Sequence, residues 1–278
     1  ITPQLGKDAF QEADVFGITA PTCKHSYLVK NADDIPRVVE ESFHISTTGR
    51  PGPIVIDLPK DVTSAVTTAK TSNVEMDLPG YELDTDLDVA TIKKMAKALK
   101  QSKRPLLLFG HGGIISKASK ELQELAETLN APVVTTKLGK GSIPENHELA
   151  LGMLGMHGTA YANKAVAGCD LIFSIGSRWD DRITPLKIER FCPGAVKLHI
   201  DIDPAEINKV LVPDYSVVAD AKRAVKELLK HISPCQSKRW VAETKKNKKK
   251  FPLKYKIHGG LKAQHVIDVA YQLSKGNA

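Results

Sequence analysis

The sequence has few of the features that mark disulfide-rich, metal-binding or membrane proteins. Its four cysteines, Cys23, Cys169, Cys192 and Cys235, are scattered, and no pair has the C-x-x-C spacing of a metal or redox site. No apolar run approaches the roughly 20 residues of a membrane span, and residues 1–10 lack the basic start and apolar core of a signal peptide. We therefore expect a cytoplasmic protein with free thiols, no membrane partner and no metal site in this chain.

Positive charge is concentrated in one segment. The net charge is +7, but residues 238–262 contain ten Lys or Arg and a single acid, Glu243, so the other residues sum to −2. A nucleic-acid-binding domain spreads its positive charge over a binding face, and few aromatic side chains interleave with these lysines to stack on bases. The run at 245–250 could contact an anionic surface. A solvated helix or linker is the simpler interpretation, and we expect no nucleic-acid partner.

Apolar runs that alternate with amphipathic stretches predict an α/β fold with a doubly wound parallel sheet. Alternation of strands and helices produces parallel βαβ units. The central domain is expected over residues 87–232. Its predicted strands cover 105–109, 132–136, 171–175 and 196–202, and helical spacing of apolar residues marks helices around 92–99, 118–129, 162–169 and 221–229.

The two ends of the chain predict parts of further domains. Residues 1–64 contain a predicted helix at 34–43 and a strand at 54–58, a unit too small to bury itself, so we expect its domain to begin before residue 1. Residues 65–86 lack strong periodicity and are predicted to be a linker. A basic linker follows the central domain at 233–261, and 262–278 begins a new amphipathic helix, the expected start of a third domain.

A glycine-rich segment after the first central strand is a candidate anion site. Gly-His-Gly-Gly at 110–113 follows the strand at 105–109 and precedes a helix. Free backbone N–H groups in such a turn, together with the helix dipole, attract phosphate. The segment lacks the G-x-G-x-x-G spacing of a dinucleotide-binding turn, so an ordinary glycine-rich turn is an equal alternative.

Two later strands end in polar residues suited to a nucleotide. Gly176 follows one buried strand, and Arg178 and Arg182 beyond it can neutralise a pyrophosphate. The next strand ends in Asp201 and Asp203, where an acid can hold ribose hydroxyls. In parallel sheets, ligands bind at the carboxyl ends of the strands. The pattern indicates a nucleotide-cofactor site, with two core strands that simply have polar ends as the alternative.

The segment Leu-Gly-Met-His-Gly at 154–158 is a further candidate. Met156 offers a soft, polarizable surface for a flat ring. A loop that ends in a helix cap explains the same residues, and a lone histidine is more often structural than catalytic. No metal-ligand spacing joins His157 to His111, His147 or His199, so no metal site is expected here.

Seven motifs, in order along nearly the whole chain, resemble the acetohydroxyacid synthase (acetolactate synthase) large catalytic subunit family of thiamine-diphosphate enzymes. Each is weak alone, but their order and intervals together are specific. They are Gly-Lys-Asp-Ala-Phe-Gln-Glu at 6–12, Thr-Cys-Lys-His at 22–25, Gly-Arg-Pro-Gly-Pro at 49–53, Asp-Leu-Pro-Lys-Asp at 57–61, the segment at 154–158, Arg-Trp-Asp-Asp-Arg-Ile-Thr at 178–184 and His-Ile-Asp-Ile-Asp at 199–203.

The resemblance implies the end of a pyrimidine-binding domain at 1–64, an FAD-binding domain at 87–232 and the start of a pyrophosphate-binding domain at 262–278. Enzymes of this family condense two pyruvates, or pyruvate and 2-oxobutyrate, with loss of CO2 in isoleucine and valine biosynthesis. Their FAD has no net redox role in this reaction. Homodimers or homotetramers and a small regulatory subunit are implied partners. The residues that bind thiamine diphosphate and Mg2+ would lie outside this chain, so we expect the chain alone to bind FAD and to be inactive.

Carried over residue by residue, the resemblance implies a catalytic set and a cofactor set. Gln11 and Lys60 match positions that face the active site across the dimer interface, and Arg182 matches the arginine that grips the carboxylate of the second 2-oxo acid. The positions that match the FAD lining are Phe10, Arg50, Gly110, His111, Gly112, Thr136, Lys137, Leu138, Leu154, Gly155, Met156, His157, Gly176, Ser177, Arg178, Asp180, Arg182, Ile183, Asp201, Ile202, Asp203, Glu206 and Asp220.

The chain also departs from the family pattern. Trp179 stands where members usually have Phe, Pro185 and Ala219 stand where they have Gly, and Lys137 replaces an apolar residue near the flavin. These changes bear on flavin affinity. A related thiamine-diphosphate flavoenzyme, of the pyruvate oxidase or glyoxylate carboligase type, is an alternative that the motif at 178–184 disfavours. A non-catalytic nucleotide-binding module of the same fold is another.

Overall fold

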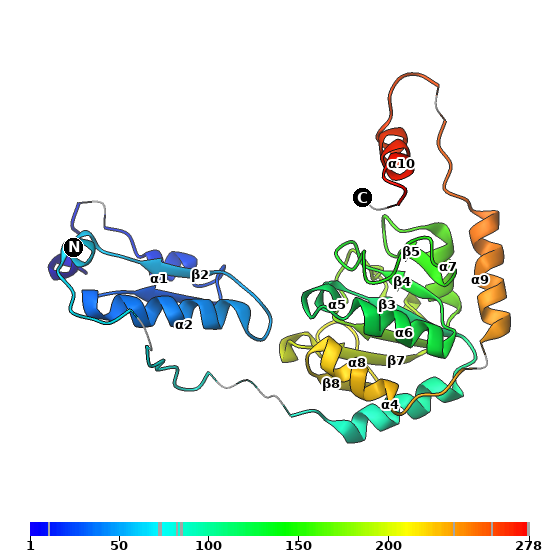
Figure 1. The fold of residues 1–278 in the computed structure, drawn as a ribbon, viewed down its shortest axis with the longest axis horizontal. Helices are drawn as coiled ribbons and strands as arrows, with labels where there is room; N and C mark the ends of the chain where they lie inside the picture. Colours follow the sequence, from blue (N-terminus) through cyan, green and yellow to red (C-terminus); the bar gives the residue numbers. More distant parts are fainter. Residues whose placement is uncertain are drawn as a thin grey trace. The chain divides into compact units, whose positions relative to one another are not determined.

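The computed structural model describes residues 1–10, 12–71, 74–81, 83, 86–235, 237–256 and 258–276. The chain forms two compact units, which we describe separately (Figure 1). The first comprises Ile1–Asp88, Ile202–Ala205 and Val218–Asp220, and the second comprises Val89–Asp201, Glu206–Val217 and Ala221–Ala278. Within the described ranges, no helix combines the length and the apolar character needed to cross a membrane.

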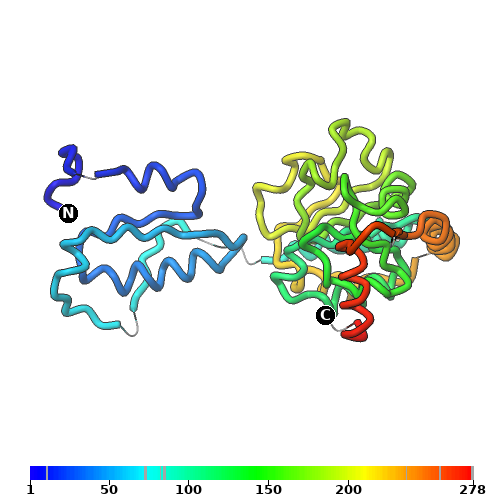
Figure 2. Tube along the Cα trace, turned by 90° about the horizontal axis from the view of Figure 1, so that it is seen from above, coloured from blue at the N-terminus to red at the C-terminus, as the bar shows by residue number. Residues whose placement is uncertain are grey.

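The first unit is built on two parallel strands and one long helix. Strand β1 (His25–Leu28) pairs in parallel with β2 (Ile54–Asp57), and α2 (Ile35–Thr47) runs alongside both strands (Figures 1 and 2). The predicted helix and the strand at 54–58 are confirmed, whereas β1 was not predicted. The short elements are η1 (Thr2–Gln4), α1 (Val15–Thr19), η2 (Ala32–Asp34) and α3 (Lys60–Ser64).

A buried carboxylate ties the segment after α3 to helix α2. The side chain of Glu41 is 1% exposed and accepts hydrogen bonds from Tyr27 Oη at 2.9 Å, Arg37 Nη1 at 3.0 Å and the Asp77 backbone N–H at 2.9 Å. Burial alone would raise the pKa of this carboxyl, but the three donors outweigh it and hold the pKa below its ordinary value. The expected linker at 65–86 is therefore fastened to the first unit at Asp77.

We expect Glu41→Gln to lower the free energy of unfolding of the first unit by about 1–3 kcal/mol at neutral pH, because an amide leaves donors imperfectly paired. A carboxyl with a depressed folded-state pKa stabilises fully above its unfolded pKa and loses that contribution as pH falls through the folded value. The wild-type unit should therefore weaken on acidification below about pH 5, and the variant less so. Hydrogen exchange of the α2 amides in urea measures both effects. Glu40→Gln is the control because Glu40 is adjacent and exposed; equal losses in both variants would contradict the assignment.

The second unit contains a six-stranded sheet with the order β5-β4-β3-β6-β7-β8. The chain winds from β3 through β4 to β5, returns to the other side of β3 at β6, and continues to β7 and β8. Every pairing from β5 to β7 is parallel, so the predicted doubly wound parallel sheet is confirmed. The strands are β3 (Pro105–Phe109), β4 (Val133–Thr135), β5 (Ala150–Met153), β6 (Leu171–Ile175), β7 (Val196–Asp201) and β8 (Tyr215–Val218).

Helices bury the apolar residues of this sheet. Helix α8 packs against α4 and α6, and α7 packs against α9 (Figure 1). Leu106 and Leu108 of β3 join the core cluster that includes α7 and Trp240; because side chains alternate along a strand, Leu107 and Phe109 face the opposite side. The elements are α4 (Val89–Gln101), α5 (His111–Ile115), α6 (Ser119–Leu129), α7 (Ala160–Gly168), η3 (Ile188–Arg190), η4 (Pro204–Glu206) and α8 (Ala221–Leu229).

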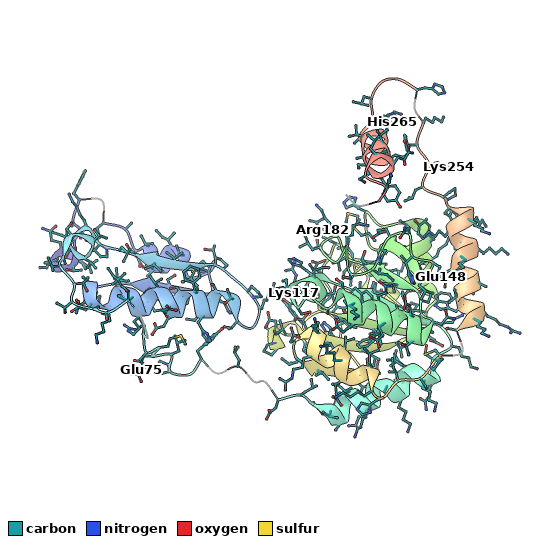
Figure 3. The ribbon with its side chains drawn as sticks, in the orientation of Figure 1. Glu75, Lys117, Glu148, Arg182, Lys254 and His265 are labelled. Carbon is teal, nitrogen blue, oxygen red and sulfur yellow. The ribbon has the colours of Figure 1, made fainter. Side chains whose placement is uncertain are left out.

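The basic segment differs from the expected linker because its first half is a packed helix, α9 (Lys238–Lys250). Trp240 is 2% exposed, and its Nε1–H donates to the Pro105 carbonyl at 3.0 Å. On the same helix, Lys245 Nζ lies 2.7 Å from Glu148 Oε2, and Glu148 is labelled in Figure 3. The high lysine count hides a buried stripe of Trp240, Val241 and Thr244, whose spacing is helical.

Helix α10 (Ala263–Leu273) follows α9 in the chain and matches the predicted amphipathic helix. None of its residues is buried. Its contact with the preceding segment is polar: Tyr255 Oη donates to Asp268 Oδ2 at 3.1 Å and lies 3.4 Å from His265 Nδ1. The labels of Lys254 and His265 in Figure 3 mark this region.

Candidate functional site

Candidate cofactor residues of the second unit follow the carboxyl ends of five neighbouring parallel strands. Gly110 follows β3, Thr136 follows β4, Leu154 follows β5, Gly176 follows β6, and Asp201 is the last residue of β7. Strands β3 and β6 are the neighbours between which the winding reverses. In open α/β sheets, ligands bind outside the carboxyl ends of the strands at such a point. The structure thus brings these residues to one edge of the sheet.

The loops after β3 and β6 are in direct backbone contact. Gly112 N–H donates to Gly176 O at 2.9 Å, and a Cβ on Gly110 would lie 2.1 Å from that same oxygen. The N–H groups of Gly110 and Gly113 also donate within the protein, to the carbonyls of Ile175 and Gly110. The expectation that this turn keeps free N–H groups for a phosphate is therefore wrong for these three residues. The glycines are needed because the two loops touch.

The turn after β5 meets the far half of the loop after β6. Gly155 has φ +94°, and a Cβ there would lie 2.1 Å from the Arg182 carbonyl oxygen. Met156 N–H donates to that oxygen at 3.0 Å. Asn163 of α7 fixes the turn, because its amide accepts from Gly155 N–H at 2.8 Å and donates to Gly155 O at 2.9 Å. Met156 and Arg182 are thus held side by side. Asn163 was not predicted from the sequence.

Asp180 organises the loop that carries two arginines. Its carboxylate lies 3.1 Å from Arg178 Nη2 and accepts the Arg182 backbone N–H at 3.2 Å, and its carbonyl accepts from Thr184 N–H at 2.9 Å. The side chains of Arg178 and Arg182 are 54% and 68% exposed. Arg182 Nη2 is 3.8 Å from Asp181 Oδ2, and Figure 3 labels its place. Asp180 therefore shapes the loop, while both guanidinium groups remain accessible to an anion.

Other candidates divide into exposed side chains and core side chains. His111, Lys137, Leu138 and His157 are exposed. The side chains of Leu154, Ser177 and Ile183 are buried, so direct ligand contact would have to come from their backbone atoms. These two groups could not be distinguished from the sequence, because a motif match does not show whether a side chain is buried or exposed.

Comparison with known proteins assigns the chain to a family. Residues 92–228 match the family model described as "Thiamine pyrophosphate enzyme, central domain". The chain is 43% identical over 259 residues to the acetolactate synthase large subunit of Cyanidium caldarium, covering 90% of this chain and 44% of that protein. It is 41% identical over 272 residues to the acetolactate synthase of Mycobacterium bovis, covering 95% and 44%. Against the acetolactate synthase isozyme 3 large subunit of Escherichia coli it is 38% identical over 286 residues, covering 100% and 50%.

The chain belongs to the acetolactate synthase large-subunit family. It spans between 44% and 50% of the length of these three relatives. The resemblance drawn from the seven motifs is confirmed, as is the thiamine-diphosphate enzyme fold of the second unit.

Several candidates of this acetolactate synthase family member lie in the first unit. Phe10 is 94% exposed, and Lys60 is the first residue of α3. Arg50 lies between α2 and β2, and its Nη1 is 2.8 Å from Asp203 Oδ2 within this unit. Gln11, the remaining catalytic candidate, falls outside the described residues.

Three candidates follow β7 or precede α8. Ile202 directly follows β7, Glu206 is 4% exposed with Lys209 Nζ 3.1 Å from its Oε1, and Asp220 directly precedes α8.

The departures from the family pattern fit the structure without backbone strain. The resemblance implies glycine at Pro185 and Ala219, but neither residue adopts a positive φ, so neither position needs glycine here. Lys137 is exposed after β4. Trp179 is 1% exposed inside the core cluster of the second unit. Its side chain therefore attaches the loop that carries Arg178 and Arg182 to the core and does not face a ligand.

Two buried thiols, Cys192 and Cys235, take no part in the candidate site. Cys192 is fully buried in the core cluster, and burial raises its pKa to about 11. Burial likewise raises the pKa of Cys235 to about 11. A thiol, rather than a thiolate, is a poor nucleophile and metal ligand. Among the described residues, no group of three or more His, Cys, Asp or Glu is placed to hold a metal ion.

Proposed function

We propose that the second unit binds FAD along the carboxyl edge of its sheet. One observation carries the proposal: the loops after β5 and β6 are joined by the bond from Met156 N–H to the Arg182 carbonyl, so the two backbones meet at this edge, and both side chains are exposed. A flavin dinucleotide needs an apolar surface for its ring and cations for its pyrophosphate, and this arrangement supplies both.

The residues fit FAD in chemistry and charge. Arg178 and Arg182 carry planar guanidinium groups, which bind phosphate oxygens in a bidentate manner. Met156 and Leu138 are 66% and 61% exposed, so apolar area is available to a flat ring at the same edge. Asp201, at the end of β7, stands where an acid can accept hydrogen bonds from ribose hydroxyls.

Family membership supports a broader proposal for the whole protein. We propose that it condenses two pyruvates to 2-acetolactate, or pyruvate and 2-oxobutyrate to 2-aceto-2-hydroxybutyrate, with release of CO2 in branched-chain amino-acid biosynthesis. Thiamine diphosphate with Mg2+ supplies the decarboxylation and carbon–carbon bond formation when bound. The catalytic set would be Gln11, Lys60 and Arg182, with the exposed Arg182 guanidinium holding the carboxylate of the second 2-oxo acid.

The proposed setting is a cytoplasmic homodimer or homotetramer with a small regulatory subunit. The name "large subunit" of the relatives supports an assembly of unlike subunits. Free cysteines at Cys23, Cys169, Cys192 and Cys235 fit a reducing compartment.

Titration of FAD into the chain, followed by flavin fluorescence and the visible spectrum, tests the cofactor proposal. We expect saturable one-to-one binding. Arg178→Ala and Arg182→Ala should each raise the Kd about 10- to 100-fold, because a charge-assisted hydrogen bond to phosphate contributes about 1.5–3 kcal/mol. Arg190→Ala is the matched control, since Arg190 is exposed in the neighbouring η3. Absence of saturation, or an equal effect of the control, would refute the proposed site.

A further inference from the structure

His199 of β7 is completely buried, and both of its ring nitrogens bond to the loop that carries the arginines. Trp179 Nε1 lies 3.1 Å from His199 Nδ1, and His199 Nε2 lies 3.1 Å from the Ser177 carbonyl oxygen. The two aromatic rings meet edge to face, with centroids 5.5 Å apart and planes at 77°. Ser177 and Trp179 are the two neighbours of Arg178, so the imidazole ring bonds to the residue on each side of that arginine, to the backbone at Ser177 and to the side chain at Trp179.

The partners of His199 fix its tautomer. An indole N–H can only donate, so Nδ1 of His199 must accept and carries no proton. The proton of the neutral ring is therefore on Nε2, which donates to Ser177 O. That oxygen also accepts from Ser174 Oγ at 3.3 Å. Asp201 is a charged group that faces the ring, and its Oδ2 is 3.7 Å from Nε2. A buried network with every polar group satisfied specifies a single arrangement of the groups it contains.

The far side of Trp179 is fixed as well. Its ring packs edge to face on Phe191, with centroids 5.6 Å apart, and its carbonyl accepts from Thr184 Oγ1 at 3.3 Å. The loop is therefore held at Ser177, Trp179 and Thr184, while Arg178 and Arg182 between these points remain exposed. A phenylalanine at 179 could pack in the same space but could not donate to His199.

We propose that His199 is a positioning residue: through Ser177 and Trp179 it fixes the loop in the conformation in which Arg178 and Arg182 bind the anionic part of the cofactor. The proposal rests on the FAD site proposed above. His199 does not touch the ligand. Both of its hydrogen bonds end on the loop, so their loss should leave the sheet intact and make the loop that carries Arg178 and Arg182 more mobile. A more mobile loop should bind the ligand less tightly, because preorganised binding groups lose less conformational entropy when a ligand binds.

Two variants of the full chain remove the bond between Trp179 and His199 from either side. Trp179→Phe keeps a ring against Phe191 but removes the donor. His199→Gln keeps an amide N–H for Ser177 but removes the ring acceptor. In each we expect about tenfold faster hydrogen exchange at Ile183 and Thr184 and an FAD Kd about five- to tenfold higher, the effect of one net hydrogen bond. The amides of both reporter residues bond to the Asp180 carbonyl in this loop.

The control is Phe191→Leu, which disturbs the packing around Trp179 without removing either bond of His199. We expect it to lower the melting temperature while FAD affinity and loop exchange stay within twofold of wild type. Nitrogen-15 NMR of the wild-type chain should show His199 as the neutral tautomer protonated on Nε2. A different tautomer, unchanged Kd and exchange in Trp179→Phe and His199→Gln, or a Kd increase in Phe191→Leu equal to theirs would each overturn the proposal.

The same experiment separates this proposal from the one on which it rests. If the wild-type chain binds no FAD, the cofactor proposal fails, and loop exchange alone decides whether His199 positions the arginines. Faster exchange in both variants would then support the positioning role, and unchanged exchange would refute it. If the wild-type chain binds FAD and neither variant changes the Kd, the cofactor proposal stands and the positioning role fails.

Discussion

Replacing Gly110 with alanine should lower the free energy of unfolding of the second unit by about 3 kcal/mol or more, because the added methyl group overlaps backbone that cannot retreat. The new Cβ would lie 2.1 Å from Gly176 O and 2.5 Å from Ser177 Cβ. Gly110 has φ −105°, which alanine adopts freely, so the whole effect comes from the contact. Separating the loops after β3 and β6 would also break the bond from Gly112 N–H to Gly176 O and weaken the proposed binding of FAD.

Urea unfolding followed by tryptophan fluorescence measures this loss, because both tryptophans of the chain, Trp179 and Trp240, lie in the core cluster of the second unit. Gly168→Ala is the matched control. A Cβ on Gly168 would have its nearest contact at 3.4 Å from the Trp240 ring, and alanine favours the helix in which it lies, so we expect a change within about 0.5 kcal/mol. Wild-type stability in Gly110→Ala would show that the two loops do not meet as described.

The central strands were predictable because they are buried on both faces. Strands β3 and β6 have the bounds expected from their continuous apolar runs, as parallel strands covered by helices on both sides require. The strands β1, β5 and β8 were missed. They lie at sheet edges or in a two-stranded sheet and are only four residues long, so they lack an apolar run that distinguishes them from a loop.

The position of the candidate site was also predictable, since the carboxyl ends of parallel strands share one edge. Its internal contacts were not. The role of Gly110 in loop contact depends on the distance to Gly176, and the bonds of Asn163 and His199 join segments that are separate in the sequence. Sequence patterns report the type of a residue and its period along the chain. They do not report which loop it will touch.

The composition of residues 238–250 did not predict a packed helix, because seven Lys or Arg among 13 residues obscured three buried side chains. The packing of α9 on the second unit can be tested at Trp240. This ring is 2% exposed, donates to Pro105 O at 3.0 Å, shares a core cluster with the buried residues of α7 and lies under the Arg104 guanidinium at 5.1 Å. The Trp240 side chain therefore connects α9 to strand β3 and to helix α7.

Trp240→Ala should lower the free energy of unfolding of the second unit by about 3–5 kcal/mol, since truncation leaves a large cavity and an unpaired carbonyl at Pro105. Urea unfolding followed by far-ultraviolet circular dichroism measures the loss. Lys249→Ala is the control on the same helix, because Lys249 is exposed, and we expect it to change stability by less than about 0.5 kcal/mol. Equal stability of the two variants would mean that α9 is only loosely attached. A large loss in Trp240→Ala alone would show that the lysine-rich segment is part of the core of the second unit.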